Sequence, residues 1–171
     1  MNKYLLDTNI LVYLEMKYIP NHEAIEKQMA ALDDEDEIYV SILAIYEMYY
    51  GASRCTPENR PRMLAMIKSV KKKFIILLLQ EEGAEVYGGL KTIYKEKTGI
   101  GKKEITKHNI DFILAASAVT AKAILVSNDG IFQDIQKTDP ILRLENWLPA
   151  KKFFKRHNNL IIIAITESFF Q

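Results

Sequence analysis

Cysteine, histidine and long hydrophobic runs are scarce in this chain. The single cysteine, Cys55, cannot form an internal disulfide or supply a cysteine cluster for a metal, which favours a reducing cytoplasm. The histidines His22, His108 and His157 are too scattered to offer a soft metal site. The longest apolar run, Leu160 to Ile165, is too short to span a bilayer. We therefore expect neither a membrane protein nor a disulfide-stabilised one.

Neither sign of charge predominates, because 23 lysines and arginines nearly balance 22 aspartates and glutamates and leave a net charge of +1. A balanced total gives no indication of a nucleic-acid partner, so the distribution is more informative than the sum. Basic residues cluster at 68–73, 91–107 and 151–157, and acidic residues at 33–37. Basic clusters can hold phosphate backbones, although a solvated helix face is the commoner explanation for any one of them. The middle cluster comprises Lys91, Lys95, Lys97, Lys102, Lys103 and Lys107.

Apolar residues make up 49% of the chain, which suits one globular domain with a proper core. Short apolar runs alternate with segments of helical periodicity. This order predicts an α/β domain in which a mostly parallel five-stranded sheet is flanked by helices, with right-handed crossovers. The uninterrupted run Phe74 to Leu79 is typical of the middle of a parallel sheet. The predicted strands are Lys3–Leu6, Ile38–Val40, Phe74–Leu79, Ala123–Val126 and Ile141–Leu144.

Capping and stop residues predict where three of the helices begin or end. Thr8 or Asn9 is expected to cap the first helix, and Gly51 to end the helix after the second strand. Thr106 is expected to cap the helix that precedes the fourth strand. Asp111 then lies about one turn into that helix, near its amino end.

Four acidic residues fall where the strands of such a sheet end. Asp7 follows the first strand and Asp129 the fourth, while Glu47 lies about a turn and a half into the helix after the second strand. Asp111 reaches the same edge from the amino end of its helix. Taken alone, Asp7 either accepts hydrogen bonds as a turn residue or faces the crevice where open parallel sheets bind ligands. Their shared edge predicts that the four carboxylates converge on one crevice.

Converging carboxylates repel one another and raise each other's pKa unless cations neutralise them. All-oxygen ligation suits Mg²⁺ or Mn²⁺, which keep several waters and take phosphate oxygens as further ligands. The pattern therefore indicates a metal-dependent phosphodiesterase, in which one ion, or two about 4 Å apart, activates a water and clamps the scissile phosphate. For each acid taken singly, a cap or surface role is the alternative.

Five segments stand in a characteristic order and spacing along the chain. They are Leu5-Leu6-Asp7-Thr8-Asn9; Ser41 with Glu47-Met48 and Gly51; the run from His108 to Ala116; Leu125-Val126-Ser127-Asn128-Asp129 with Phe132; and Leu144-Glu145-Asn146-Trp147. Together they resemble PIN-domain proteins, and specifically the VapC-type ribonuclease toxins of toxin–antitoxin pairs. No single segment is specific, but their combination is, and it covers residues 1–149.

The resemblance implies a PIN-like nuclease domain over residues 1–149. Its implied catalytic, metal-binding acids are Asp7, Glu47, Asp111 and Asp129, with Thr8, Asn9, Ser127 and Asn128 supporting them. Some relatives carry a further acid where this chain has Ile131, which favours one metal site or a weaker second one. The resemblance also implies a homodimer, and a cognate antitoxin whose tail occupies the active-site groove, often with an arginine against the acids.

Residues 150–171 have no counterpart in this resemblance, because such proteins usually end soon after the Asn-Trp pair. The segment contains a basic stretch followed by the apolar run Leu160 to Thr166. An added edge strand or a dimer contact is one expectation, and a mobile segment is the other.

The expected function is that of a Mg²⁺- or Mn²⁺-dependent endoribonuclease of the cytoplasm, held in check as a toxin by its antitoxin. Lysines near the groove are expected to hold single-stranded or loop RNA. Alternatives are a PIN nuclease of RNA processing or DNA metabolism, and a non-catalytic module, either a degenerate PIN domain or a receiver-like domain. A receiver-like domain would pair two acids after the first strand and place a lysine after a late one, and this chain does neither. Three tyrosines either pack in the core or a dimer contact, or form an aromatic nucleic-acid platform: Tyr46, Tyr49 and Tyr50.

Overall fold

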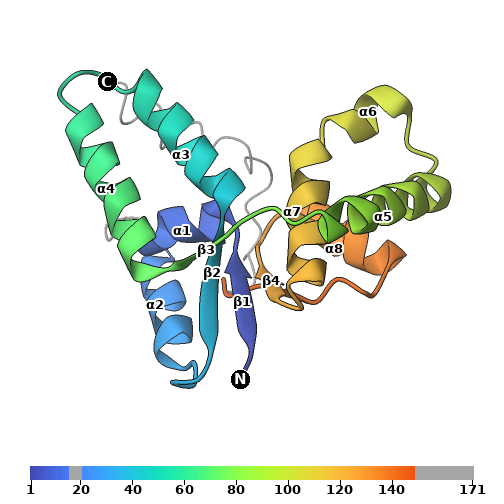
Figure 1. The fold of residues 1–171 in the computed structure, drawn as a ribbon, viewed down its shortest axis with the longest axis horizontal. Coiled ribbons are helices and arrows are strands. Elements are labelled where there is room, and N and C mark those ends of the chain that lie inside the picture. Colours follow the sequence, from blue (N-terminus) through green and yellow to red (C-terminus); the bar gives the residue numbers. More distant parts are fainter. Residues whose placement is uncertain (16–20, 149–171) are drawn as a thin grey trace.

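The computed structural model of the protein describes residues 1–15 and 21–148. In this part of the chain a five-stranded sheet has the order β3-β2-β1-β4-β5, and every neighbouring pair of strands is parallel (Figure 1). The strands are β1 (Lys3–Leu6), β2 (Glu37–Ser41), β3 (Ile75–Leu77), β4 (Ile124–Val126) and β5 (Leu144–Glu145). The helices are α1 (Thr8–Glu15), α2 (His22–Ala30), α3 (Ile42–Arg54), α4 (Arg60–Lys73), α5 (Glu82–Thr98), α6 (Lys102–Thr106), α7 (Asn109–Thr120) and α8 (Gly130–Thr138). The predicted α/β class and its parallel five-stranded sheet are confirmed.

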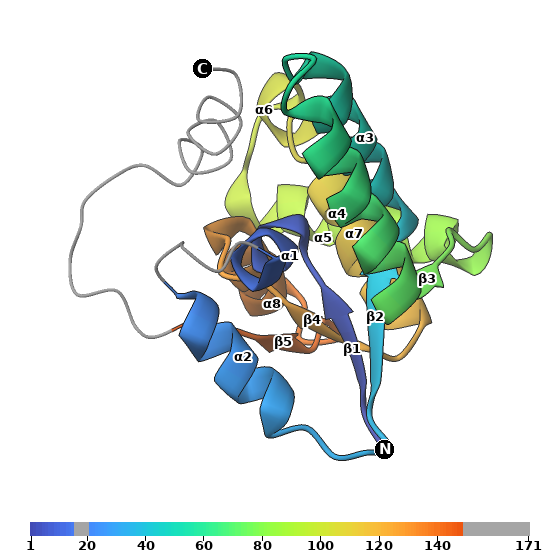
Figure 2. The same ribbon diagram turned by 90° about the vertical axis from the view of Figure 1, so that its left-hand side faces the viewer.

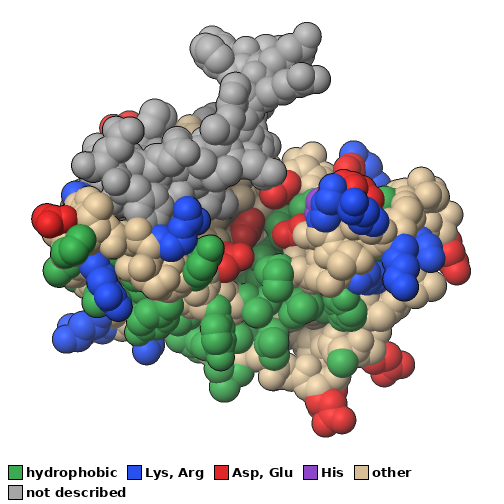
Figure 3. Space-filling view, turned by 90° about the horizontal axis from the view of Figure 1, so that it is seen from above, with side chains coloured by type: hydrophobic (Ala, Val, Ile, Leu, Met, Phe, Trp, Pro, Cys, Tyr) green, Lys and Arg blue, Asp and Glu red, His purple; other side chains and the backbone are tan. Residues whose placement is uncertain are grey.

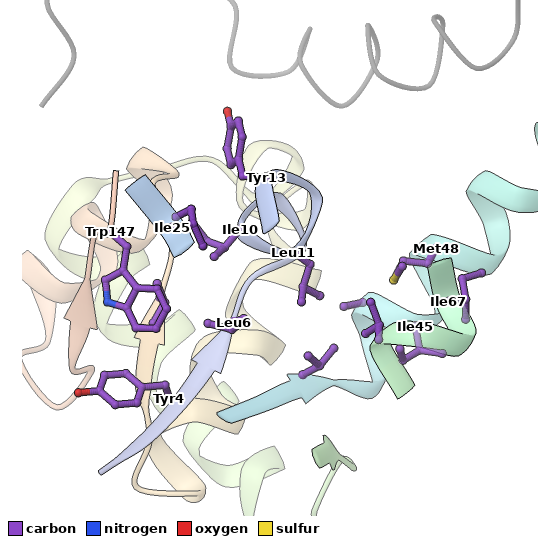
Figure 4. Close-up of a cluster of buried hydrophobic side chains, with 14 of the residues drawn as sticks. Tyr4, Leu6, Ile10, Leu11, Tyr13, Ile25, Ile45, Met48, Ile67 and Trp147 are labelled. Atoms are coloured by element: carbon purple, nitrogen blue, oxygen red, sulfur yellow. The ribbon is translucent and has the colours of Figure 1, made fainter. Parts of the chain in front are cut away.

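Strand β1 lies at the centre of the sheet and contributes to two hydrophobic cores. Successive side chains of a strand point to opposite faces, so Leu6 packs in one core and Leu5 in the other, both fully buried. Helices α1 to α4 supply the first core, toward the viewer in Figure 2, and helices α5 to α8 supply the second. Figure 4 shows the first core, in which Ile10 lies near Leu6 and the rings of Tyr4 and Trp147 are 5.4 Å apart. Burial on both faces fixes β1, so its successor Asp7 emerges at the carboxyl edge between the two helical layers.

The position predicted for the run Phe74 to Leu79 is wrong. Only Ile75–Leu77 form a strand, and β3 lies at an edge of the sheet beside β2. Leu78 and Leu79 leave the sheet and are 62% and 51% exposed. An apolar run identifies a strand, but its place in the sheet depends on which strand can be covered on both faces, and β1 takes that place.

Several predicted boundaries also differ from the structure. Asp7 caps α1, because its carbonyl oxygen accepts the first helical hydrogen bonds, so neither Thr8 nor Asn9 is the cap. Helix α3 continues past Gly51 to Arg54. Thr106 belongs to the short helix α6, where its hydroxyl donates to the Lys102 carbonyl, and α7 begins separately at Asn109. The last strand is Leu144–Glu145, later than predicted.

The tyrosines of α3 lie on the surface. Tyr46 and Tyr50 are 70% and 65% exposed, and Tyr49 is 47% exposed, so they do not pack in the core, and the dimer contact and the nucleic-acid platform stay predictions. Within residues 1–15 and 21–148, no helix combines the length and the apolar composition needed to cross a membrane. The expectations for residues 150–171 lie outside the described part of the chain.

Candidate active site

Asp7 is held at the junction of β1 and α1 by both its backbone and its side chain. The Asp7 N–H donates to the Val126 carbonyl at 3.0 Å, which extends the pairing of β1 with β4. Its carboxylate accepts two hydrogen bonds: Oδ1 from the Thr8 N–H at 2.7 Å and Oδ2 from the Ser127 hydroxyl at 2.6 Å. Asp7 therefore fills both roles that the sequence left open, because it is a turn residue and also faces the crevice.

Three of the four predicted acids line one pocket at the carboxyl edge of the sheet. Asp7 lies beside Glu47 from α3 and Asp111 from α7, together with Thr8. The pocket has a volume of about 40 Å³. A cavity needs roughly 10–15 Å³ to hold one water, so an ion with a few waters fits. The apolar part of its wall consists of Leu6, Leu43, Ala44, Ile110 and Leu114. Figure 3 shows acidic side chains in the hollow between the two halves of the molecule.

Glu47 reaches the pocket because of where α3 starts. Buried Ser41 ends β2 and accepts a hydrogen bond from the Leu43 N–H at 3.2 Å, so it caps α3 at the carboxyl edge. Glu47 follows about a turn and a half later, and its Oε2 accepts a 2.6 Å hydrogen bond from the Thr8 hydroxyl. This contact orients Glu47 toward Asp7.

Asp111 lies in the first turn of α7 and pairs with a histidine that the sequence analysis did not single out. His108 Nδ1 lies 2.9 Å from Asp111 Oδ2, so the ring carries its proton on that nitrogen when it donates to the carboxylate. The spacing of three residues within one helical turn is the signal that could have revealed this pair. Burial raises the pKa of Asp111, the His108 hydrogen bond opposes this, and the charge of Asp129 adds to it.

Asp129 is near the other acids, but it is not among the residues that line the pocket. Its Oδ1 accepts a hydrogen bond from the Ile131 N–H at 3.2 Å, so it caps α8. Its own N–H donates to the Ser127 hydroxyl oxygen at 3.1 Å, which links Asp129 to Asp7 through one side chain. Its negative charge raises the pKa of both Asp7 and Asp111.

The predicted supporting residues divide into two groups. Thr8 and Ser127 contact the acids directly. Asn128 instead lies beside the Tyr13 hydroxyl and opposes the rise of its pKa, and the buried Asn9 Oδ1 has no hydrogen-bond partner within residues 1–15 and 21–148. Adjacent positions in one segment thus serve different parts of the structure.

The Asp7 carboxylate is desolvated and lies near two other negative charges. Desolvation raises the pKa of Asp7 from its ordinary value of 3.8 to about 7, and the charges of Glu47 and Asp129 act in the same direction. Hydrogen bonds from Ser127 and Thr8 lower that pKa but do not outweigh burial. A cation bound beside Asp7 would relieve both the desolvation and the repulsion.

The donor chemistry of the pocket fits a hard divalent cation, but the acids do not form a ready cage. Among the described residues, no three His, Cys, Asp or Glu side chains are placed so that they could together hold an ion. The reason is visible in the hydrogen bonds: Asp7, Glu47 and Asp111 are each turned toward a protein donor. Carboxylate oxygens are the ligands that Mg²⁺ and Mn²⁺ prefer, so the side chains are of the right chemistry but would have to turn from these hydrogen bonds to share one ion.

The fold and this acidic pocket define a class of protein. The chain belongs to the PIN-domain family, whose profile matches residues 4–138. Within that family it is similar to ribonuclease VapC2 of Haemophilus influenzae, with 30% identity over 149 residues that make up 86% of this chain and 100% of that protein. It is also 26% identical to ribonuclease VapC2 of Rickettsia felis, over 84% of this chain and 97% of that one.

Solved structures of VapBC complexes are also similar to this chain. VapBC2 from Rickettsia felis, bound to a DNA fragment from its promoter, superposes with a TM-score of 0.66 at 27% identity. VapBC-1 from nontypeable Haemophilus influenzae gives 0.66 at 26% identity. Each comparison covers 85% of this chain and 98% of the other. The predicted resemblance to VapC-type PIN-domain proteins is confirmed.

Proposed function

We propose that this protein is a divalent-metal-dependent endoribonuclease and the toxin of a VapBC-like toxin–antitoxin pair. The observation that carries the proposal is the pocket that Asp7, Glu47 and Asp111 line at the carboxyl edge of a PIN fold. The 30% identity with a ribonuclease over 86% of the chain supports RNA as the substrate.

The acids have distinct roles in this proposal. Asp7 and Asp111 would hold the Mg²⁺ or Mn²⁺ ion, and Glu47 and Asp129 would either help to hold it or orient the attacking water. Bound there, the ion supplies charge neutralisation at the scissile phosphate and a water of lowered pKa. Thr8 orients Glu47, and Ser127 orients Asp7 and the backbone of Asp129. Leu43, Ile110 and Leu114 limit the access of bulk water to the pocket.

Two protein partners belong to the proposal. One is a cognate antitoxin that covers the acidic pocket, and the other is a second copy of the chain. Exposed apolar side chains on α3 and α4 support a protein contact in this region, because patches of this kind mark interaction surfaces. They are Tyr46, Tyr49, Tyr50 and Leu64.

The test is single-turnover cleavage of total cellular RNA by the purified, antitoxin-free protein in Mg²⁺, Mn²⁺ or EDTA. We expect discrete fragments that require a divalent ion, and mapping of their ends identifies the target. Structured DNA is assayed in parallel, and discrete cleavage of that DNA without cleavage of RNA would indicate a nuclease of DNA metabolism. No cleavage by a folded protein under any of these conditions would overturn the proposal in favour of a binding module.

The Thr8 hydroxyl is expected to affect activity through Glu47. In Thr8→Val the shape of the side chain is nearly unchanged, but the hydrogen bond to Glu47 is lost. Residues that orient metal-binding groups contribute about 10–100-fold to affinity or rate, so we expect about 10-fold slower cleavage and a higher Mg²⁺ requirement. Thr8→Ser keeps the hydroxyl and should stay close to the parent. Equal rates for the valine and serine variants would contradict the positioning role.

A further inference from the structure

Lys91 of α5 stands out among the lysines of the middle basic cluster because two neutral side chains hold its ammonium group. Its Nζ donates to the Tyr87 hydroxyl at 2.8 Å and to Asn109 Oδ1, and it lies 5.1 Å from the centre of the Tyr87 ring. The Tyr87 hydroxyl in turn donates to Asn109 Oδ1 at 3.2 Å. All three side chains are partly buried. The ammonium is therefore fixed in place and only partly solvated.

No ion pair joins Lys91 to a carboxylate within the described part of the chain. Among its neighbours in the cluster, Lys107 differs because it pairs with Glu104 at 2.7 Å, whereas Lys97 is also held by a neutral group, the Thr138 carbonyl, at 2.7 Å. The ammonium is thus held in position by neutral groups, and an anion bound from solution would supply its counter-charge.

The hydrogen-bond inventory of this group leaves only donors to spare. Lys91 has three N–H donors, and two of them are used. Asn109 accepts both bonds through Oδ1, so its Nδ2 amino group points elsewhere. Asn109 is also the first residue of α7, whose amino end carries the positive end of a helix dipole. A ligand with several acceptor oxygens and a negative charge suits this arrangement.

The position of Asn109 on α7 shows where Lys91 lies relative to the acidic pocket. Asn109 and Asp111 share the first turn of α7, and two residues correspond to a rotation of about 200° around the axis. Lys91 therefore lies on the opposite flank of that turn from Asp111, about one helix diameter, roughly 10 Å, away. In Figure 3 basic side chains lie on both halves of the molecule, including the half that carries α5, α6 and α7. An RNA strand with its scissile phosphate in the pocket would have to cross this end of α7 to bring a neighbouring phosphate to Lys91.

We propose that Lys91, Tyr87 and Asn109 form a phosphate-binding subsite for the RNA backbone, beside and not at the scissile phosphate. This inference rests on the proposed ribonuclease function. The subsite contributes affinity and register without reading sequence, because it contacts the backbone alone. It binds substrate and transition state equally, so it acts on substrate affinity and leaves the chemical step unchanged.

The test is Lys91→Gln under single-turnover conditions, with enzyme in excess over RNA containing the mapped target and with Mg²⁺ present. We expect the half-saturating enzyme concentration to rise about 5-fold, while the maximal rate changes less than about 2-fold. In EDTA, the binding of a fluorescent single-stranded oligoribonucleotide is measured at several salt concentrations. The slope of the logarithm of the binding constant against the logarithm of the salt concentration should become shallower by about 0.7, the value for one lost phosphate contact. Lys91→Arg should retain both values.

Two further variants separate the subsite from general effects. Lys95→Gln removes an exposed charge one turn along α5 and should leave affinity near that of the parent. Asn109→Asp supplies a carboxylate to Lys91 and should weaken RNA binding even though the lysine remains. Melting temperatures within about 2 °C of the parent would show that both proteins are folded.

Three results would overturn the subsite. One is a half-saturating concentration for Lys91→Gln equal to that for Lys95→Gln. Another is a lower maximal rate with unchanged affinity, which would mean that Lys91 only supports the α7 turn beneath Asp111. The third is that Lys91→Gln binds the antitoxin more weakly but binds RNA as the parent does, which would mean that Lys91 pairs with a carboxylate of the antitoxin. If the wild-type protein neither binds nor cleaves RNA, the proposed function fails, and the subsite fails with it.

Discussion

Asp7→Asn is expected to lower the single-turnover rate of RNA cleavage in Mg²⁺ by about 10³-fold. Asparagine has nearly the same shape and can keep the hydrogen bond from the Thr8 N–H, but its amide is neutral and a poor ligand for a divalent ion. The substitution therefore removes charge from the pocket with little change in packing. The measurement is the rate at saturating enzyme, with circular dichroism as a check of folding.

The matched control is Asp134→Asn, which neutralises an exposed acid of α8 that pairs with Lys137 on the same helix. Its cleavage rate should match that of the parent, because Asp134 is not one of the residues that line the pocket. A rate for Asp7→Asn within about 3-fold of the parent would contradict the metal-binding role of Asp7. It would leave Asp7 as a structural cap of α1.

The same substitution is expected to stabilise the metal-free protein at neutral and alkaline pH. The folded-state pKa of Asp7 is raised to about 7, whereas the unfolded chain ionises near 3.8. The stability that protonated Asp7 contributes is therefore complete below pH 3.8 and is lost as the pH rises to about 7. Asparagine does not ionise, so the difference in melting temperature between Asp7→Asn and the parent should widen from pH 5 to pH 8.

The expected widening is about 1–2 kcal/mol, or roughly 2–6 °C, which allows for partial solvation of the carboxylate in the pocket. Melting curves in EDTA at several pH values measure it. Addition of Mg²⁺ should raise the melting temperature of the parent, because the folded state alone binds the ion, and should have little effect on Asp7→Asn. A difference between the two proteins that stays constant with pH would show that Asp7 keeps an ordinary pKa.

The sequence alone determined the fold class and the approximate positions of the elements. Alternation of apolar runs with helical periodicity was sufficient, because buried strands and amphipathic helices leave a local signal. The location of the acids was also readable, since Asp7 follows β1 directly and Asp129 lies three residues after the end of β4. Spacing along α3 and α7 added Glu47 and Asp111, because a helix that starts at the carboxyl edge keeps its first two turns near that edge.

Only the tertiary structure decided features that depend on long-range contacts. The strand order placed the apolar β3 at an edge and β1 at the centre, a choice set by which strand both helical layers cover. The hydrogen bonds Thr8 to Glu47 and Ser127 to Asp7 join residues far apart in the chain, so no local pattern contained them. The raised pKa of Asp7 likewise follows from burial and neighbouring charge, which exist only once the strands and helices have packed.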